Sequence, residues 1–220
     1  MNYITERREE EKERRREEIL DAAERIFAEK GFDSATMDQV AKEARVSRAL
    51  VYVYFKDKES LFLGICFRGL STLRDLFQAA RERYPRGAEQ VRAIGQAYRH
   101  FSEQYPVHFA ALSRFEAKEP DLDPSNPDSQ ALELLNIGKK VHEQTVLALL
   151  QGQQDGSIKK DLGNLMQVSI MLWGFTHGTI QLARTKCAFM QAMGIDQMSF
   201  MDQALDLVMQ ALIPPNQEST

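Results

Sequence analysis

The sequence predicts an all-α protein of about nine helices, and three observations support this prediction. Apolar residues recur at intervals of three and four along almost all of the 220 residues, as expected for helices with one buried face. No stretch shows the alternation of a half-buried strand, because VYVY at 51–54 lies inside a helical pattern. Capping residues, glycine and proline separate the periodic stretches, and these are the positions where helices begin and end.

The first helix is expected from about residue 6 to Lys30. Charged residues at 6–18 fill its first half, and Ile19 to Phe27 form an apolar stripe in its second half. Gly31 follows, and glycine at this position commonly ends a helix. We expect the charged half to be a solvated helix held by its own ion pairs, each of which contributes about 0.2–0.5 kcal/mol.

Two short helices separated by a turn of about three residues come next. Thr36 with Gln39 forms a capping-box pattern that opens a helix over 37–44. Ser47 can cap a second helix over 48–55. This succession is the geometry of the helix-turn-helix motif, in which the second helix lies in the major groove of DNA.

Six further helices are expected in the rest of the chain. A long one begins after Asp57 and ends before Pro85, because proline cannot continue a helix. The others are expected at about 88–104, 106–116, 128–153, 162–189 and 197–212. The segment 118–129 contains three prolines and is expected to be a surface loop, and residues 214–220 a frayed tail.

Composition indicates a globular protein that does not span a membrane. The chain is 43% hydrophobic, enough to bury a core, and contains no uninterrupted apolar stretch of about 18 residues and no secretory signal pattern. Cys66 and Cys187 lie apart in apolar helical stretches, so we expect both to be small buried hydrophobes. These features predict a cytoplasmic protein in a reducing compartment.

The charge balance excludes DNA binding by a broadly basic domain. The net charge is −4, and residues 1–60 carry 13 lysines and arginines against 15 aspartates and glutamates. Binding to nucleic acid would therefore need a local arrangement of a few cations. The helix at 48–55 offers one, because Phe55 and either Leu50 or Val51 are expected to turn inward and to leave Arg48 and Tyr52 exposed. An arginine can contact guanine O6 and N7, and a tyrosine hydroxyl suits a phosphate oxygen.

Residues 18–65 resemble the N-terminal domain of the tetracycline-repressor (TetR/AcrR) family of bacterial transcription regulators. Four stretches carry the resemblance: IxxAAxxxFxxxGF from Ile19 to Phe32, Thr36 to Val40, Ala44 to Ser47, and VYVYFKDKESL from Val51 to Leu61. The resemblance implies a DNA-binding domain over 1–60 and a helical effector-binding and dimerisation domain over 61–220. It also implies a repressor that leaves a palindromic double-stranded DNA operator when a small apolar effector binds.

The same resemblance assigns DNA contacts to individual positions. Contacts to bases are implied for Ser47, Arg48 and Ala49, at the start of the recognition helix. Contacts to phosphates are implied for Thr36, Tyr52 and Lys58, with a further contact for Tyr54.

The chain departs from the family pattern at two positions. Arg45 stands where many relatives have glycine, and it either adds a cation near the DNA backbone or lies in solvent. Leu50 replaces a common threonine, which removes one polar contact from the expected set. Two alternatives stay open: Tyr54 is equally a core residue, and Arg7, Arg8 or Arg14 of the charged run 6–18 can reach DNA as an N-terminal arm.

In the resembled family, the helices after the DNA-binding domain enclose an effector pocket, and the last two helices form a four-helix bundle with a second subunit. A homodimer through 162–189 and 197–212 is therefore implied. Gly174 and Gly178 independently favour close helix packing, because they leave one face of a bulky helix flat. The residues expected to bind the effector are Tyr98, Phe101, His108, Phe115, Trp173, Thr176 and His177.

Catalytic and metal-binding patterns are missing from the sequence. It contains no HExxH, no CxxC and no glycine-rich phosphate loop, so no enzymatic activity, cofactor or metal is expected. The alternative function is a helical small-molecule or lipid-binding protein whose helix-turn-helix is only structural, which the charge balance favours. Steep salt dependence of DNA binding would separate the two, because phosphate contacts release counterions.

Overall fold

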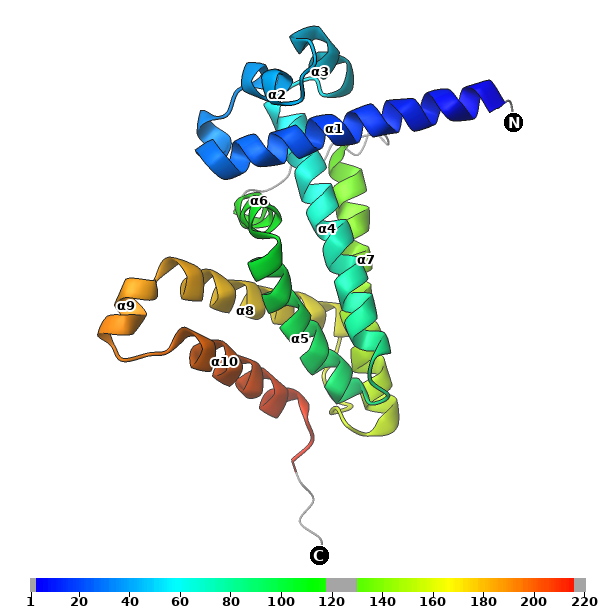
Figure 1. Ribbon diagram of the computed structural model, residues 1–220. Helices are drawn as coiled ribbons and strands as arrows, with labels where there is room; N and C mark the ends of the chain where they lie inside the picture. Colours follow the sequence, from blue (N-terminus) through cyan, green and yellow to red (C-terminus); the bar gives the residue numbers. More distant parts are fainter. Residues whose placement is uncertain (1–2, 118–129, 216–220) are drawn as a thin grey trace, which may run out of the picture. The chain divides into compact units, whose positions relative to one another are not determined.

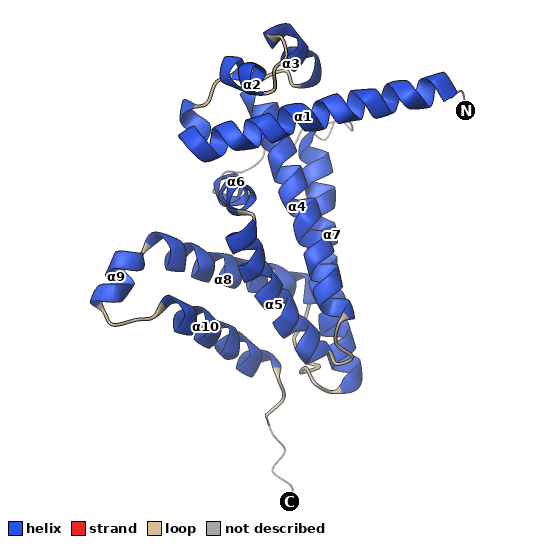
Figure 2. Ribbon diagram, in the orientation of Figure 1, coloured by secondary structure: helices blue, strands red, loops and turns tan. Residues whose placement is uncertain are grey.

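The computed structural model describes residues 3–117 and 130–215, and every regular element in these ranges is an α-helix (Figures 1 and 2). This confirms the predicted all-α fold. The helices are α1 Tyr3–Ser34, α2 Met37–Glu43, α3 Arg48–Tyr54, α4 Lys58–Glu82, α5 Gly87–Gln104, α6 Pro106–Glu116, α7 Gln130–Asp155, α8 Leu165–Thr185, α9 Cys187–Ala192 and α10 Gln197–Leu212. The loop expected at 118–129 and the end of the expected tail lie outside the described residues. Among the residues described, no helix is both long and apolar enough to cross a membrane.

The chain divides into two compact units. The first comprises Met1–Gly69 and Val107–Leu134, and the second comprises Leu70–Pro106 and Leu135–Thr220. Helices α4 and α7 each contribute residues to both units. The boundary expected at residue 60 stays a prediction about domains.

The first unit contains the three helices of the predicted motif. Helix α1 packs on α2, and α2 packs on α3. Leu20, Val40 and Val51 come one from each helix and are almost fully buried, so the three helices share one apolar core. The φ angle of Gly31 is 75°, which interrupts α1 directly after Lys30, where the sequence predicted the end of the first helix.

An arginine on α4 joins α4 to α1. The guanidinium of Arg68 donates to carboxylates of Asp21 at 2.7 Å and Glu24 at 2.8 Å, and its Nε donates to Glu17 at 2.9 Å. His108 of α6 reaches the same Glu24 oxygen at 3.0 Å. Burial raises the pKa of Glu24, but its hydrogen bonds with His108 and Arg68 outweigh this effect, and the pKa lies below its usual value. The cluster thus holds Glu24 ionised and ties three helices together.

The second unit is built on the mutual contacts of α5, α8 and α10. At its centre the ring of Tyr98 stacks on Trp173, with centroids 4.6 Å apart, and meets Phe77 edge-on at 5.9 Å. Aromatic pairs of this kind add about 0.5–1.5 kcal/mol beyond the burial of their area. Two ion pairs link the exposed sides of α5 and α10: Arg92 with Asp206 and Arg99 with Asp202.

The helix expected at 162–189 is divided in the structure. Asn164 caps α8, since its side chain accepts from the backbone N–H groups of Met166 and Gln167. Helix α8 stops at Thr185, because Lys186 has φ −115° and ψ 27°, and the short α9 follows. The described residues therefore contain ten helices, one more than predicted.

Helices α5 and α7 meet at two glycines. A Cβ atom on Gly87 would lie 2.0 Å from the backbone nitrogen of Gly152 and 2.5 Å from the carbonyl oxygen of Ala148. Both obstacles are backbone atoms, which cannot turn aside as a flexible side chain can. We predict that Gly87→Ala lowers the free energy of unfolding by about 1–3 kcal/mol, measured by urea denaturation.

Gly138, on α7, supplies the matched control. A Cβ there would meet nothing within 4 Å, so Gly138→Ala should raise the free energy of unfolding by about 0.5–1 kcal/mol through the helix preference of alanine. Similar stabilities for the two variants would contradict the close approach at Gly87.

Candidate nucleic-acid interface and ligand cavity

The turn of the helix-turn-helix spans Ala44 to Ser47. The N–H of Val46 donates to the carbonyl of Ala41 at 3.0 Å, which closes the turn. Arg45 has φ 57°, in the left-handed region that glycine adopts most easily. A glycine would adopt this conformation more easily than arginine does. Arg45 itself is exposed to solvent.

Hydroxyl side chains cap both helices of the motif. Thr36 forms the complete capping box with Gln39: its Oγ1 accepts from Gln39 N at 3.3 Å, and Gln39 Oε1 accepts from Thr36 N at 3.1 Å. Ser47 Oγ accepts from the N–H of Leu50 at 3.1 Å. A capping hydroxyl acts as an acceptor and keeps its own proton, so both hydroxyls can still donate to a phosphate oxygen.

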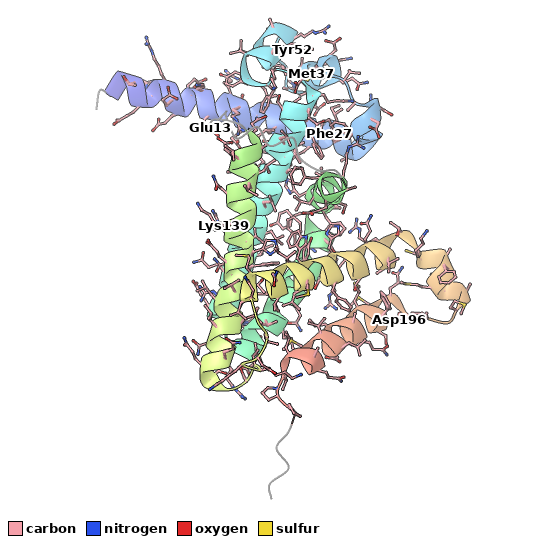
Figure 3. All side chains as sticks on the ribbon, turned by 180° about the vertical axis from the view of Figure 1, so that it is seen from behind. Glu13, Phe27, Met37, Tyr52, Lys139 and Asp196 are labelled. Carbon is pink, nitrogen blue, oxygen red and sulfur yellow. The ribbon has the colours of Figure 1, made fainter. Side chains whose placement is uncertain are left out.

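Helix α3 separates a buried face from an exposed one. Val51 and Phe55, at its end, are 0% and 1% exposed, whereas Tyr52 and Val53 are 41% and 75% exposed. Tyr52 lies on the outside of the motif in Figure 3. The predicted base-facing residues, Ser47, Arg48 and Ala49, are exposed, and Tyr54 and Leu50 are half-buried.

The guanidinium of Arg48, at the start of α3, is held by the carboxylate of Asp38 on α2. Arg48 Nε lies 3.1 Å from Asp38 Oδ1, and Arg48 Nη1 donates to Asp38 Oδ2 at 3.2 Å, so the pair is bidentate. Arg48 also reaches the Tyr52 hydroxyl at 3.4 Å and lies over its ring, 5.5 Å from the centroid. These contacts fix the direction of the guanidinium while it stays exposed to solvent.

Lys58 makes hydrogen bonds within the protein that the sequence did not reveal. Its ammonium donates to the carbonyl oxygens of Phe32, Asp33 and Ala35, at 2.9, 3.1 and 3.1 Å, and lies 4.6 Å from the centroid of the Phe32 ring. An ammonium has three N–H donors, so these carbonyls occupy all of them. A phosphate contact by Lys58 would have to replace one of these bonds.

Within the described residues, the second unit contains two small cavities of about 30 Å³ each and a wider, more open hollow of about 740 Å³, lined by residues of α5 and α10 and of the segments that follow α7 and α10. Of the residues expected to bind an effector, Tyr98, Trp173 and Thr176 line one of them, and His177 is hydrogen-bonded to the Tyr98 hydroxyl through Nδ1 at 2.6 Å. Phe101 is fully buried and stacks on Tyr105, without lining either cavity. His108 and Phe115 belong to the first unit.

In the cavity that Tyr98 and Trp173 line, sequence reasoning missed three polar residues: His142, Thr145 and Ser169. His142 Nδ1 lies 3.0 Å from Ser169 Oγ. His142 and Thr145 are three residues apart, the spacing of one helix face, and this was the available signal. Burial lowers the pKa of His142 and of His177, so both imidazoles are neutral at pH 7.

No group of three or more histidine, cysteine, aspartate or glutamate side chains in the described ranges is arranged to hold a metal ion. The thiol of Cys66 is buried, and burial raises its pKa. The polar groups that the first unit offers are helix caps and exposed side-chain ends. The second unit offers an apolar cavity with neutral polar groups.

Comparison with known proteins identifies the N-terminal motif. Residues 19–65 match the family described as bacterial regulatory proteins, tetR family. The HTH-type transcriptional regulator HbdR of Aromatoleum sp. (strain CIB) is 38% identical over 78 residues, which are 35% of this chain and 31% of HbdR. The chain thus spans about a third of the length of this curated relative.

Solved structures extend the likeness in fold to most of the chain. A tetR-family regulator from Shewanella sp. PV-4 superposes with a TM-score of 0.66 at 15% identity, over 91% of this chain and 99% of that one. FadR of Bacillus subtilis, solved in complex with stearoyl-CoA, gives a TM-score of 0.66 at 19% identity, over 87% and 96% of the two chains. At these identities the likeness shows a shared fold.

The bonds of Lys58 generate a stability prediction. Replacement by methionine keeps much of the aliphatic volume but leaves three carbonyls at the end of α1 without their donor. We predict that Lys58→Met lowers the free energy of unfolding by about 1–3 kcal/mol in the absence of DNA, measured by urea denaturation. The exposed Lys56 provides the control, and Lys56→Met should change stability by less than about 0.5 kcal/mol. Equal stabilities would show that the three carbonyls do not depend on this ammonium.

Proposed function

We propose that the protein is a ligand-responsive transcriptional repressor, because residues 19–65 match the tetR family of bacterial regulatory proteins. It binds a palindromic DNA operator and leaves it when a small molecule occupies the second unit. The observation that carries the proposal is the exposed, oriented pair Arg48 and Tyr52 on a helix whose other face is buried.

In the proposed complex, α3 enters the major groove with its N-terminal end toward the bases. Arg48 is the base reader, because its guanidinium can donate two parallel bonds to guanine. Ser47 and Ala49 flank it, and Thr36, Tyr52 and Tyr54 contact phosphates on either side. Asp38 favours this role by keeping Arg48 extended, at the cost of an ion pair that DNA must replace.

Lys58 has a different place in the proposal. Its three carbonyl partners favour a role in holding the end of α1 beneath the motif, with any phosphate contact secondary. The residue would then act on DNA binding by positioning the motif.

A homodimer supplies the second recognition helix that a palindrome requires. Several large apolar side chains on α8, α9 and α10 are exposed in the single chain: Ile170, Met171, Phe175, Leu182, Phe189, Met193, Met198 and Leu207. A Cβ on Gly174 or Gly178 would meet nothing within 4 Å, so this side of α8 is open to a close neighbour. Burial of such a surface in a symmetric partner supports the proposed dimer.

The proposed response to a ligand requires a conformational change, because each of the two small cavities is smaller than an organic ligand. Ligand pockets usually measure about 300–1,000 Å³, far more than either cavity here. An effector that occupies either of these two cavities must therefore select or create an expanded conformation. It weakens DNA binding only if that conformation binds DNA less well, since equal affinity for both states shifts nothing.

DNA recognition is tested by two variants on a site selected from random duplex DNA. Arg48→Ala should weaken binding to the selected site by about 1–3 kcal/mol and relax base preference there. Tyr52→Phe should weaken binding to all sequences alike, by about 0.5–1.5 kcal/mol, because it removes a phosphate bond and leaves Arg48 to contact the bases. Fluorescence anisotropy against the selected and a mutated site measures both effects.

Arg25, an exposed arginine of α1 paired with Glu43, is the matched control for the lost charge. Arg25→Ala should change affinity for either DNA by less than about 0.5 kcal/mol. Failure to select any duplex, or a wild-type affinity that is insensitive to salt, would favour a ligand-binding protein with a purely structural helix-turn-helix.

The dimer is tested by a charge on the exposed apolar surface. Leu182→Asp should convert the protein to a monomer, because an unpaired carboxylate would be buried in the symmetric contact. Leu147 on α7 is similarly exposed, and Leu147→Asp should leave the dimer intact. Light scattering after size-exclusion chromatography gives the mass; a wild-type monomer, or a dimer that survives Leu182→Asp, argues against this interface.

A further inference from the structure

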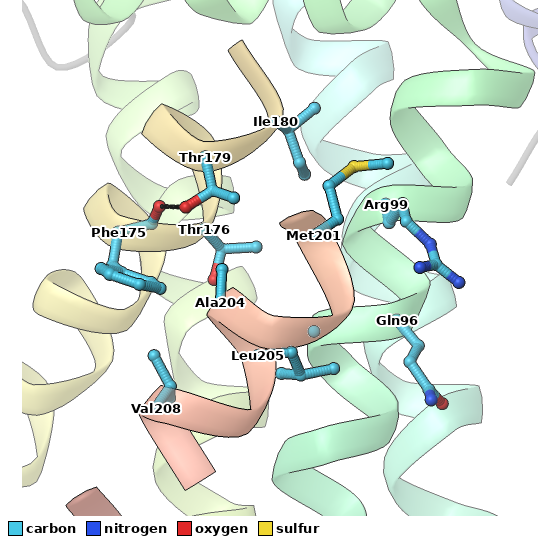
Figure 4. Close-up of a pocket in the computed structure, with 11 residues that line it drawn as sticks. Gln96, Arg99, Phe175, Thr176, Thr179, Ile180, Met201, Ala204, Leu205 and Val208 are labelled. Atoms are coloured by element: carbon cyan, nitrogen blue, oxygen red, sulfur yellow. Dashed lines mark hydrogen bonds between the residues drawn. The ribbon is translucent and has the colours of Figure 1, made fainter. Parts of the chain in front are cut away.

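The two cavities of the second unit lie on either side of one leucine. Both are lined by Gly95, Thr176, Leu205 and Val208, so they share a wall. Figure 4 shows the residues that line the first of these cavities, with Leu205 of α10 between Val208 on one side and Gln96 and Arg99 of α5 on the other. Each cavity holds about two waters at most, so neither alone admits an organic ligand.

Leu205 reaches this position because α5 has a glycine opposite. A Cβ on Gly95 would lie 2.8 Å from Leu205 Cδ1. The obstacle is the end of a flexible side chain, which can rotate without moving a backbone. Rotation or shortening of the leucine therefore removes the wall and joins the two cavities.

The lining of the joined space carries no uncompensated charge. Arg99 is the one charged lining residue, and its Nη1 donates to Asp202 at 2.6 Å. The remaining polar groups are hydroxyls, a carboxamide and His142, and the flat rings of Tyr98 and Trp173 form one wall. His142 is neutral at pH 7, because burial lowers its pKa. A carboxylate or an ammonium placed here would lose its water without gaining a partner ion.

We propose that the two cavities form a single effector site divided by Leu205, and that its ligand is an uncharged, flat aromatic molecule. The ligand displaces Leu205, stacks against the Tyr98 and Trp173 rings and offers its polar group to His142 or Thr176. The proposal rests on the proposed regulatory function and specifies the ligand class of its effector side. It differs from the fatty acyl-CoA named for the FadR complex, whose phosphates would find no free cation among these lining residues.

Trp173 is the single tryptophan of the chain, so its fluorescence reports directly on this site. The probes are methyl benzoate and benzoate, which share a ring and differ in charge at pH 7.5. Leu205→Ala should bind methyl benzoate at least about tenfold more tightly than the wild-type protein, because the dividing side chain is gone. Benzoate should bind the same variant at least about a hundredfold more weakly than the ester, because its charge is desolvated without a partner.

Two further variants guard against a trivial cavity effect. Leu149 of α7 is fully buried and lines neither cavity, so Leu149→Ala should leave the Trp173 response to methyl benzoate as in the wild-type protein. Leu205→Phe thickens the wall and should abolish the response. Circular dichroism verifies that each variant is folded, and Leu205→Val replaces Leu205→Ala if the alanine variant is not, with a smaller gain in affinity for methyl benzoate expected.

Each result of these titrations either supports the proposal or overturns it. Equal or tighter binding of benzoate, no gain in Leu205→Ala, or an equal gain in Leu149→Ala overturns the proposal. The titration contains no DNA, so a failure here leaves the operator selection untouched, and a failure of that selection leaves this site intact.

Discussion

The burial of two side chains beneath α3 is the condition on which the rest of the DNA-facing surface depends. A seven-residue helix has no independent stability in water, since helices shorter than about 12–15 residues are marginal alone. Val51 and Phe55 anchor it, and the Ser47 hydroxyl satisfies one free N–H at its start. With the inner face fixed, the opposite face is presented in a single orientation, and Arg48 gains a defined direction.

The lack of excess positive charge distinguishes this motif from a basic DNA-binding domain. Residues 1–60 have more acidic than basic side chains, and even Arg48 is paired, through Asp38. Attraction at long range is therefore weak, and recognition must come from short-range contacts made after approach. In the proposed complex, such a motif would give little non-specific binding and would leave specificity to the short-range contacts.

Local sequence signals predicted the local structure well. The capping box of Thr36 and Gln39, the cap at Ser47 and the end of the first helix at Gly31 each depend on residues only a few positions apart. Contacts between distant residues escaped prediction. The carbonyl partners of Lys58 lie up to 26 positions away, and no pattern in the sequence records that distance.

The candidate ligand site shows the same limit. Aromatic residues were easy to nominate, and three of the seven nominated residues line a cavity of the second unit. Two others, His108 and Phe115, fall in the other compact unit, since helix periodicity reports which face is buried but not against which partner. His142 and Ser169 meet only because α7 and α8 pack together, so their pairing required the fold.

The absence of a free cation or carboxylate in the cavity wall has a consequence for how a signal arrives. Molecules without charge pass through a lipid bilayer far more readily than ions, because charged groups are costly to place in hydrocarbon. The proposed neutral effector site would thus be matched to compounds that permeate a bilayer unaided.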